Sequence, residues 1–111
     1  MRRVPDDLEV RDAPARSRYE LRDGDRLVGF TEYQRRGDVL VLPHTVIMEH
    51  RRGRGYATRL IRDTLDDLRG KGLRVVPECS FVADFIAENP DYADMVGPAP
   101  ETSAADGATS P

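Results

Sequence analysis

Hydrophobic and polar residues in the first half of the chain form short extended runs that turn sequences separate. The runs occupy residues 18–21, 27–34 and 39–42, with "DGD" at 23–25 and "RRGD" at 35–38 between them. Glycine in such turns accepts the positive φ that tight hairpins need. The third run, "VLVL", is apolar on both faces, as a strand in the middle of a sheet should be. The pattern predicts an antiparallel meander of three strands.

Pro43 interrupts the third run, and the extended pattern resumes over residues 44–48. Proline has no N–H to donate to a neighbouring strand. We therefore expect a bulge or a break in strand pairing at Pro43.

A helical pattern follows in the second half of the chain. Apolar or small residues recur at positions 57, 60, 61, 64, 65 and 68, which share one helix face. Glycines in "RGKG" at 69–72 end this helix, and residues 73–76 form a buried strand that Pro77 cuts short. Residues 81–86 predict a short second helix. Asn89-Pro90 predicts the start of a last helical turn, packed by Tyr92, Met95 and Val96.

The predicted order is strand, strand, strand, helix, strand, helix. This is an α/β (α+β) fold in which an antiparallel meander leads into one right-handed βαβ unit. Residues 18–96 make up this single domain. The flanking segments, 1–17 and 97–111, contain prolines and few apolar residues, so they bury too little surface to offset their ordering entropy. We expect both segments to be disordered.

"EHRRGRGYATRL" at residues 49–60 leads from the first parallel strand into its helix, where α/β sheets bind ligands. A helix N-terminus favours phosphate, glycine lets the backbone approach it, and arginine adds forked donors. Gly53 and Gly55 therefore suit a pyrophosphate cradle, although a solvated arginine loop with turn glycines gives the same pattern. Two known phosphate-binding motifs do not match this loop. A P-loop would need a Gly-Lys-Ser/Thr ending, and a dinucleotide fingerprint would need glycine where Thr58 stands.

Composition argues against several other classes of protein. The net charge of −3 disfavours general nucleic-acid binding, and "RRGRG" is too brief and too poor in aromatic neighbours for an RNA-binding segment. No apolar run is long enough for a membrane span or a signal peptide, so we expect a cytoplasmic protein without membrane contacts. Cys79, His44 and His50 are too few thiol and imidazole groups for a zinc site, and no metal is expected.

Several motifs, in order, resemble the GNAT superfamily of N-acetyltransferases. The run "HRRGRG" at 50–55 matches the acyl-CoA signature Gln/Arg-x-x-Gly-x-Gly/Ala except at His50. "HTVI" at 44–47, "GLRVVPECSFVADFI" at 72–86 and "NPDYADMV" at 89–96 are similar to the short single-domain members, in which glutamate usually stands at Val46. The resemblance covers residues 19–96.

The resemblance implies a minimal GNAT fold, with a mixed sheet whose parallel strands, 44–48 and 73–79, splay apart to admit acetyl-CoA. Pro43 and Pro77 fit such an opening because both interrupt strand pairing. The pantetheine arm would pair with Thr45 and Ile47. The pyrophosphate would bind the loop and the start of the helix, at Arg52, Gly53, Arg54, Gly55, Tyr56, Ala57 and Thr58.

The catalytic groups follow less directly. Many GNAT enzymes protonate the leaving thiol with a tyrosine, but Ile86 stands at the aligned position here. Cys79, at the end of the second splayed strand, is the candidate nucleophile or general acid, with a buried hydrophobic residue as the alternative. His44 is the candidate general base, with a hydrogen-bonded sheet histidine as the alternative. Glu32 and Glu49 are further possible bases.

These features predict an acyl-CoA-dependent N-acetyltransferase that passes an acetyl group to an unidentified amine, on a small molecule or a protein. The alternative is a CoA-binding module without efficient catalysis. The long N-terminal helical segment that walls the acceptor site in many GNAT enzymes is missing. The acceptor pocket should therefore be open, shallow or completed by another chain, and the protein a monomer or weak homodimer.

Overall fold

A computed structural model describes residues 8–48 and 55–98 of the chain. Its strands are β1 (Leu8–Ala13), β2 (Arg18–Asp23), β3 (Arg26–Glu32), β4 (Gln34–Arg36), β5 (Val39–Val41), β6 (Thr45–Ile47) and β7 (Arg74–Val76). Its helices are α1 (Tyr56–Gly70) and α2 (Ser80–Glu88), with the 3-10 turns η2 (Pro14–Arg16) and η4 (Pro90–Met95).

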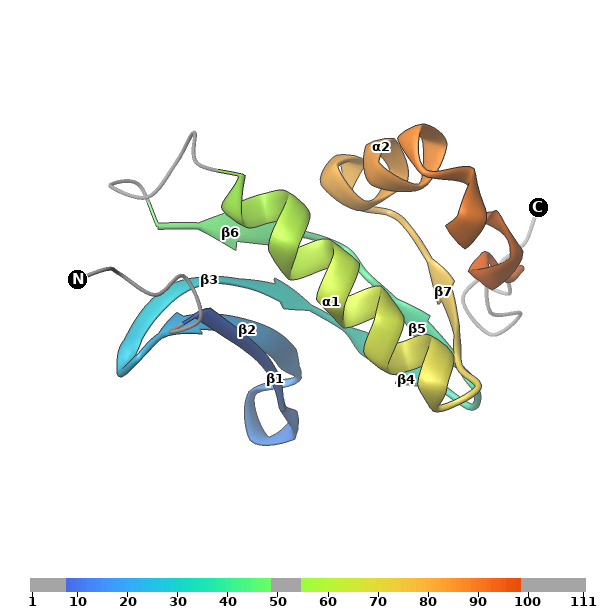
Figure 1. The fold of residues 1–111 in the computed structure, drawn as a ribbon. Helices are drawn as coiled ribbons and strands as arrows, with labels where there is room; N and C mark the ends of the chain where they lie inside the picture. The colour runs from blue at the N-terminus through green and yellow to red at the C-terminus, as the bar shows by residue number, and fades with distance from the viewer. Residues whose placement is uncertain (1–7, 49–54, 99–111) are drawn as a thin grey trace.

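The strands form two small sheets, and α1 lies across them (Figure 1). The first sheet has the order β1-β2-β3-β6 and is antiparallel throughout. The second has the order β4-β5-β7, and β5 pairs with β7 in parallel. Because α1 connects the two parallel strands, the predicted meander and the single βαβ unit are both confirmed. β5 is the central strand of its sheet, as its apolar sequence predicts.

β3–β4 and β5–β6 form one long antiparallel hairpin with a bulge beside Pro43. Gln34 pairs with Val41, and Thr31 pairs with Thr45. The segment 41–45 is therefore one residue longer than the segment 31–34 that it faces. The extra residue falls where proline cannot donate a ladder hydrogen bond. The irregularity expected at Pro43 is therefore present, and it divides the hairpin between the two sheets.

The expectation that residues 1–17 are disordered is wrong for the described part of that segment. Strand β1 pairs with β2 along its whole length, from Leu8 opposite Asp23 onward. Leu8 and Val10 pack against the core, and the Tyr33 hydroxyl donates a hydrogen bond of 2.7 Å to Asp12. The sequence "LEVRDA" has only a short alternation of apolar and charged residues, because β1 is an edge strand that covers only a margin of the core.

The C-terminal boundary also needs a correction. Gly97 was expected to lie in the disordered tail, but its N–H donates a 2.9 Å hydrogen bond to the Val75 carbonyl. Val96, expected to pack in the core, is exposed and joins the fold through a backbone bridge to Val75. The remainder of the predicted tail, from residue 99, lies outside the described residues.

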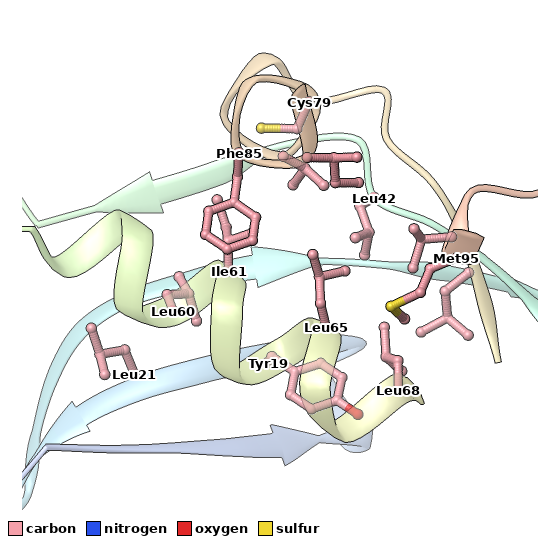
Figure 2. Packing of buried hydrophobic residues seen from close by; sticks show 14 of the residues in the cluster. Tyr19, Leu21, Leu42, Leu60, Ile61, Leu65, Leu68, Cys79, Phe85 and Met95 are labelled. Carbon is pink, nitrogen blue, oxygen red and sulfur yellow. The ribbon is translucent and has the colours of Figure 1, made fainter. Parts of the chain in front are cut away.

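Helix α1 supplies the centre of the core (Figure 2). The predicted apolar face is confirmed, and its buried residues are Leu60, Ile61, Thr64, Leu65 and Leu68. Around them lie Tyr19 and Leu21 of β2, Phe85 of α2 and Met95 of η4. No described helix is long and apolar enough to cross a membrane.

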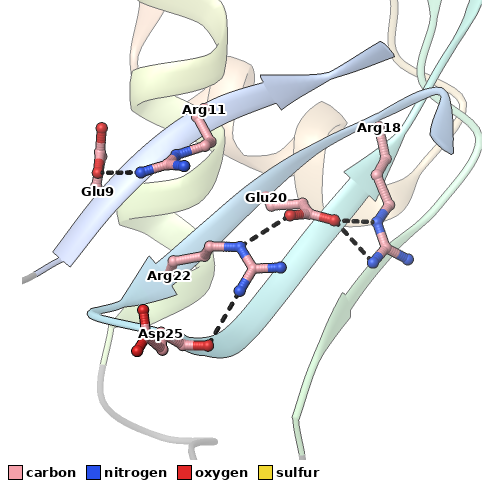
Figure 3. Close-up of polar contacts among 6 residues, drawn as sticks. All are labelled: Glu9, Arg11, Arg18, Glu20, Arg22 and Asp25. Carbon is pink, nitrogen blue, oxygen red and sulfur yellow. Dashed lines mark hydrogen bonds and ion pairs between the residues drawn. The ribbon is translucent and has the colours of Figure 1, made fainter. Parts of the chain in front are cut away.

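The face of the first sheet opposite α1 carries ion pairs (Figure 3). Glu20 is buried there, and it accepts hydrogen bonds from Arg18 at 2.8 Å and Arg22 at 3.0 Å. The Arg18 guanidinium also lies 4.2 Å from the centre of the Phe30 ring. Burial raises the pKa of Glu20, but the hydrogen bonds from both arginines outweigh it and the net shift is downward.

Candidate functional site

Strand β6 presents a free backbone edge on the side away from β3. The Met48 backbone N–H donates to the Val28 carbonyl at 2.8 Å, and the Glu32 backbone N–H donates to the His44 carbonyl at 3.0 Å. Hydrogen-bonding direction alternates along an antiparallel strand, so the N–H and C=O groups of Thr45 and Ile47 point away from β3. Among the described strands none pairs with β6 on that side. Thr45 and Ile47 are the two residues predicted to pair with a ligand.

β6 and β7 diverge immediately after Leu42. The Leu42 N–H donates to the Val76 carbonyl at 3.0 Å, and the Leu42 carbonyl accepts a 2.8 Å hydrogen bond from the Cys79 N–H. Beyond this point β6 pairs with β3, while the chain after Pro77 turns into α2 (Figure 1). β6 and the chain after β7 therefore diverge, with Leu42 at the apex of the opening. The predicted strand over residues 73–79 is shorter than expected, since β7 ends at Val76 and Cys79 already caps α2.

Cys79 lies on the far side of this opening, at the N-cap of α2 (Figure 2). Its thiol donates to the Thr45 hydroxyl at 3.3 Å, and Thr45 donates in turn to the Thr31 hydroxyl at 2.9 Å. Cys79 is 6% exposed and Thr31 is fully buried. The thiol is thus held by a hydroxyl pair at the base of the splay, a polar environment that a purely hydrophobic role would not require.

His44 lies on the opposite side of β6 from Cys79. Adjacent strand residues point to opposite faces, and Cys79 contacts the neighbouring Thr45. The His44 side chain is 63% exposed, and its Nε2 lies 2.5 Å from Glu32 Oε1. The structure therefore joins two of the candidate bases, His44 and Glu32, into one pair, and it does not bring His44 to Cys79. Glu49, the third candidate, lies outside the described residues.

A tyrosine general acid has no evident counterpart in α2. Ile86, at the aligned position, is buried in the core. The hydroxyls of Tyr19, Tyr33 and Tyr92 donate to Asp67, Asp12 and Asp66, respectively. These three tyrosines serve the packing of the fold. The protic side chains described at the apex are the Cys79 thiol and the Thr45 and Thr31 hydroxyls.

The start of α1 is open to a ligand at Gly55. This N-cap residue has φ 75°, a value that glycine adopts without strain, and a Cβ added to it would meet no atom of the described residues within 4 Å. The first turn of a helix leaves N–H groups without helical partners, and no side chain caps those of α1. Of the other predicted loop residues, Arg52, Gly53 and Arg54 lie outside the described residues.

Helix residues 56–58 have different surroundings. Tyr56 and Ala57 pack partly against the core, whereas Thr58 is exposed. Ala57 and Thr58 also line a shallow groove of about 150 Å³ between α1 and α2. Asp84 and Glu88 on its rim disfavour phosphate, while Phe81, 49% exposed, offers an apolar surface. The groove therefore suits an uncharged part of a ligand, and phosphate suits the helix start.

The described residues fit a CoA-type ligand on three counts: the free edge of β6, the unobstructed helix start at Gly55 and the polar thiol at the apex. Sequence reasoning missed the contribution of Thr31, and it treated Thr45 only as a backbone partner. The complete burial of Thr31 and its position opposite Thr45 are both seen only in the structure.

Comparisons with known proteins concern the family and the fold. A sequence profile described as GCN5-related N-acetyl-transferase matches residues 18–95. The fold is similar to the NMR solution structure of a GCN5-like protein from Staphylococcus aureus, with a TM-score of 0.62 and 17% sequence identity. That alignment covers 83% of this chain and 90% of the other chain, and at such low identity it concerns the fold.

Proposed function

The chain belongs to the GCN5-related N-acetyltransferase family, and on this premise we propose that it transfers an acetyl group from acetyl-CoA to an amine. The observation that carries the proposal is the free edge of β6, which ends beside the Cys79 thiol. An extended pantetheine arm would use the backbone groups of Thr45 and Ile47 as a neighbouring strand does. The N–H groups at the start of α1 would receive the pyrophosphate.

Acetyl transfer needs a neutral amine, a polarised carbonyl and a proton for the leaving thiolate. As a nucleophile, Cys79 would form a new S–C bond to the acetyl group, and its proton would pass to the departing CoA sulfur. The amine would then displace the Cys79 sulfur, which recovers a proton from the amine. As a general acid, Cys79 would supply only the proton for the CoA thiolate.

A CoA-binding module without efficient catalysis is the second candidate. It is favoured by the buried Ile86 at the position of the usual tyrosine acid, and by the separation of His44 and Cys79 on opposite sides of β6. Both candidates predict CoA binding. Turnover with an amine distinguishes them.

Binding of the donor is tested by calorimetry and thermal shift with CoA, acetyl-CoA and adenosine 3′,5′-bisphosphate. A ligand at a hundredfold excess over its Kd stabilises the fold by about 2.7 kcal/mol. For a domain of this size the melting temperature should rise by roughly 10 °C or more. No shift with millimolar CoA would overturn the assignment.

Substitution at Gly55 tests where the pyrophosphate lies. Gly55→Glu should abolish CoA binding because it places a negative charge beside the helix start. Gly55→Gln is the matched control, since it imposes the same backbone strain at φ 75° without the charge. Gln should retain much more affinity than Glu. Equal affinities for the two variants would place the phosphates elsewhere.

A further inference from the structure

A groove of about 420 Å³ opens at the bulge between the two sheets. It is lined by Arg16 and Ser17, which follow β1, and by Glu32 and Pro43 among others. Ser17 has φ 54° and is the one described non-glycine residue with positive φ. Its carbonyl accepts a 2.9 Å hydrogen bond from the Tyr33 N–H, which fixes the turn after β1 against the sheet.

The groove lies next to the proposed reaction centre. Pro43 lines it and is flanked by Leu42, whose carbonyl binds the Cys79 N–H at 2.8 Å, and by His44. Glu32 also lines it and binds His44. A small molecule in the groove would therefore lie across β6 from Cys79, and its amine would reach the thioester through the opening between β6 and the chain after β7. An acceptor amine bound there would meet the His44–Glu32 pair.

The charged side chains of the groove are not balanced. Arg16, Glu32 and Arg35 line it, and Glu32 is already engaged by His44. Arg35 donates its Nε–H to the Gly37 carbonyl at 2.7 Å. Among the described residues, the two guanidinium groups of this groove form no ion pair with a carboxylate.

We propose that this groove is the acceptor site and that the acceptor carries a carboxylate or phosphate on the same molecule as its amine. The inference rests on the proposed acetyltransferase function. The amine lies at the His44–Glu32 pair, where the imidazole takes its proton. The anionic group lies at Arg16 and Arg35, because forked guanidinium donors match carboxylate and phosphate oxygens. A polyamine or a simple alkylamine has no group for these two cations.

The test is acetyl transfer from acetyl-CoA, followed as thiol release, to amines in matched pairs. One pair is each L-α-amino acid and its C-terminal amide, and the other is 2-aminoethyl phosphate and ethanolamine. Spermidine serves as the cationic comparison. Charged hydrogen bonds contribute roughly 10- to 100-fold each, so kcat/KM should favour the anionic member by at least about tenfold. The two pairs show whether carboxylate or phosphate is recognised.

Variants then assign the preference to the groove. Arg16→Gln and Arg35→Gln should raise KM for the anionic amine and leave kcat/KM for its neutral partner nearly unchanged. Arg26→Gln is the control, since Arg26 is exposed at the far end of β3. Equal kcat/KM for both members of every pair would overturn the proposal. A preference that survives both substitutions would overturn it as well.

Binding measured without turnover separates this inference from the proposed activity. The same matched amines are titrated into the protein with CoA present, and binding is followed by calorimetry. Anionic amines that bind through Arg16 but are never acetylated would support the groove and refute the enzyme activity. Acetylation that prefers neutral amines or spermidine would support the enzyme activity and refute the groove. Failure of every anionic amine both to bind and to react would refute the groove assignment.

Discussion

At the scale of single residues, Cys79 is the side chain on which the proposed mechanism depends. Its thiol donates to Thr45, which donates to the buried Thr31, so the sulfur is held at the apex by a fixed hydrogen-bonded chain. A buried cysteine usually behaves as a small hydrophobic residue. A defined polar partner next to a free strand edge favours a catalytic role for the Cys79 thiol.

Substitution of Cys79 distinguishes three roles. If it is the nucleophile, acetyl-CoA alone should add one acetyl group, labile to hydroxylamine, and Cys79→Ser should lose the adduct and turnover while CoA still binds. If it is a general acid, no adduct forms and Cys79→Ala slows turnover by roughly 10²–10⁴-fold. Intact protein mass spectrometry and a thiol-release assay measure both. Unaltered turnover of Cys79→Ala with a known acceptor would leave the residue a purely structural role.

His44 and Glu32 are expected to act together on the amine. His44→Gln should lower kcat by roughly 10²-fold or more, because it removes the imidazole that is proposed to take the amine proton. Glu32→Gln should lower it less, because the imidazole remains. Val46→Thr, on the same exposed face of β6, is the control. Steady-state kinetics at saturating acetyl-CoA measure the effect, and a His44→Gln enzyme with full kcat would contradict it.

At the scale of elements, β1 links the edge of the first sheet to α1 and to the proposed acceptor groove. Asp12 at its end accepts a hydrogen bond from Tyr33 and lies 4.0 Å from Lys71 of the α1 C-cap. The turn that follows β1 supplies Arg16 and Ser17 to the groove wall. A segment whose composition indicated disorder therefore contributes both to packing and to the proposed site.

Deletion of residues 1–13 should therefore destabilise the domain. The change exposes β2 as a new edge and removes Leu8, Val10 and the Asp12 hydrogen bond, a loss of about 2–3 kcal/mol. The melting temperature should fall by roughly 10 °C or more. Circular dichroism melting measures it, with Asp12→Asn as a milder variant that should lose only part of that amount. A truncated chain with an unchanged melting temperature would place β1 outside the cooperative fold.

At the scale of the whole molecule, the tyrosine–carboxylate contacts make stability depend on pH at both extremes. Asp67 accepts a 2.5 Å hydrogen bond from Tyr19 and lies 2.9 Å from Lys71, and these contacts hold its pKa below the usual range. Burial, followed by the hydrogen bond to Asp12, raises the pKa of Tyr33 to about 12. The pKa of Tyr19 rises for similar reasons, with burial the largest and the hydrogen bond to Asp67 next.

The sign of each contribution follows from these directions. A lowered carboxyl pKa stabilises the fold above the unfolded value, near 4, and that stability is lost as pH falls through the folded value. A raised tyrosine pKa gives stability that is present below about 10 and is lost as pH rises further. The melting temperature should therefore decline below about pH 4 and above about pH 10.

Two variants assign these limbs of the pH profile. Asp67→Asn should lower the melting temperature at neutral pH and reduce its decline on acidification, whereas Tyr33→Phe should reduce the decline on alkalinisation. Thermal melts recorded from acid to alkaline pH test both. If the melting temperature of both variants declined with pH as much as that of the wild type, other groups would control the pH dependence.

The features that the sequence determined by itself are those with a local physical cause. The face of α1 follows from a spacing of about 3.6 residues per turn, and it is buried as predicted. Gly24 and Gly37 adopt positive φ because tight hairpin turns need that conformation and glycine accepts it. Pro43 disrupts pairing wherever its strand lies, since it has no N–H. Such constraints act within a few residues and can be read along the chain.

Only the tertiary structure decided the features that depend on strand register and on pairing between distant segments. Nothing in the local sequence places Glu32 beside His44, or Thr31 beside Thr45, because either contact would be lost if β6 shifted by one residue against β3. The apolar content of β1 is too small to indicate a strand, and its order comes from the edge that β2 offers. The position of Arg16 in the groove has the same cause. The pairing of β1 with β2 places it there, and nothing in its own residue type predicts that position.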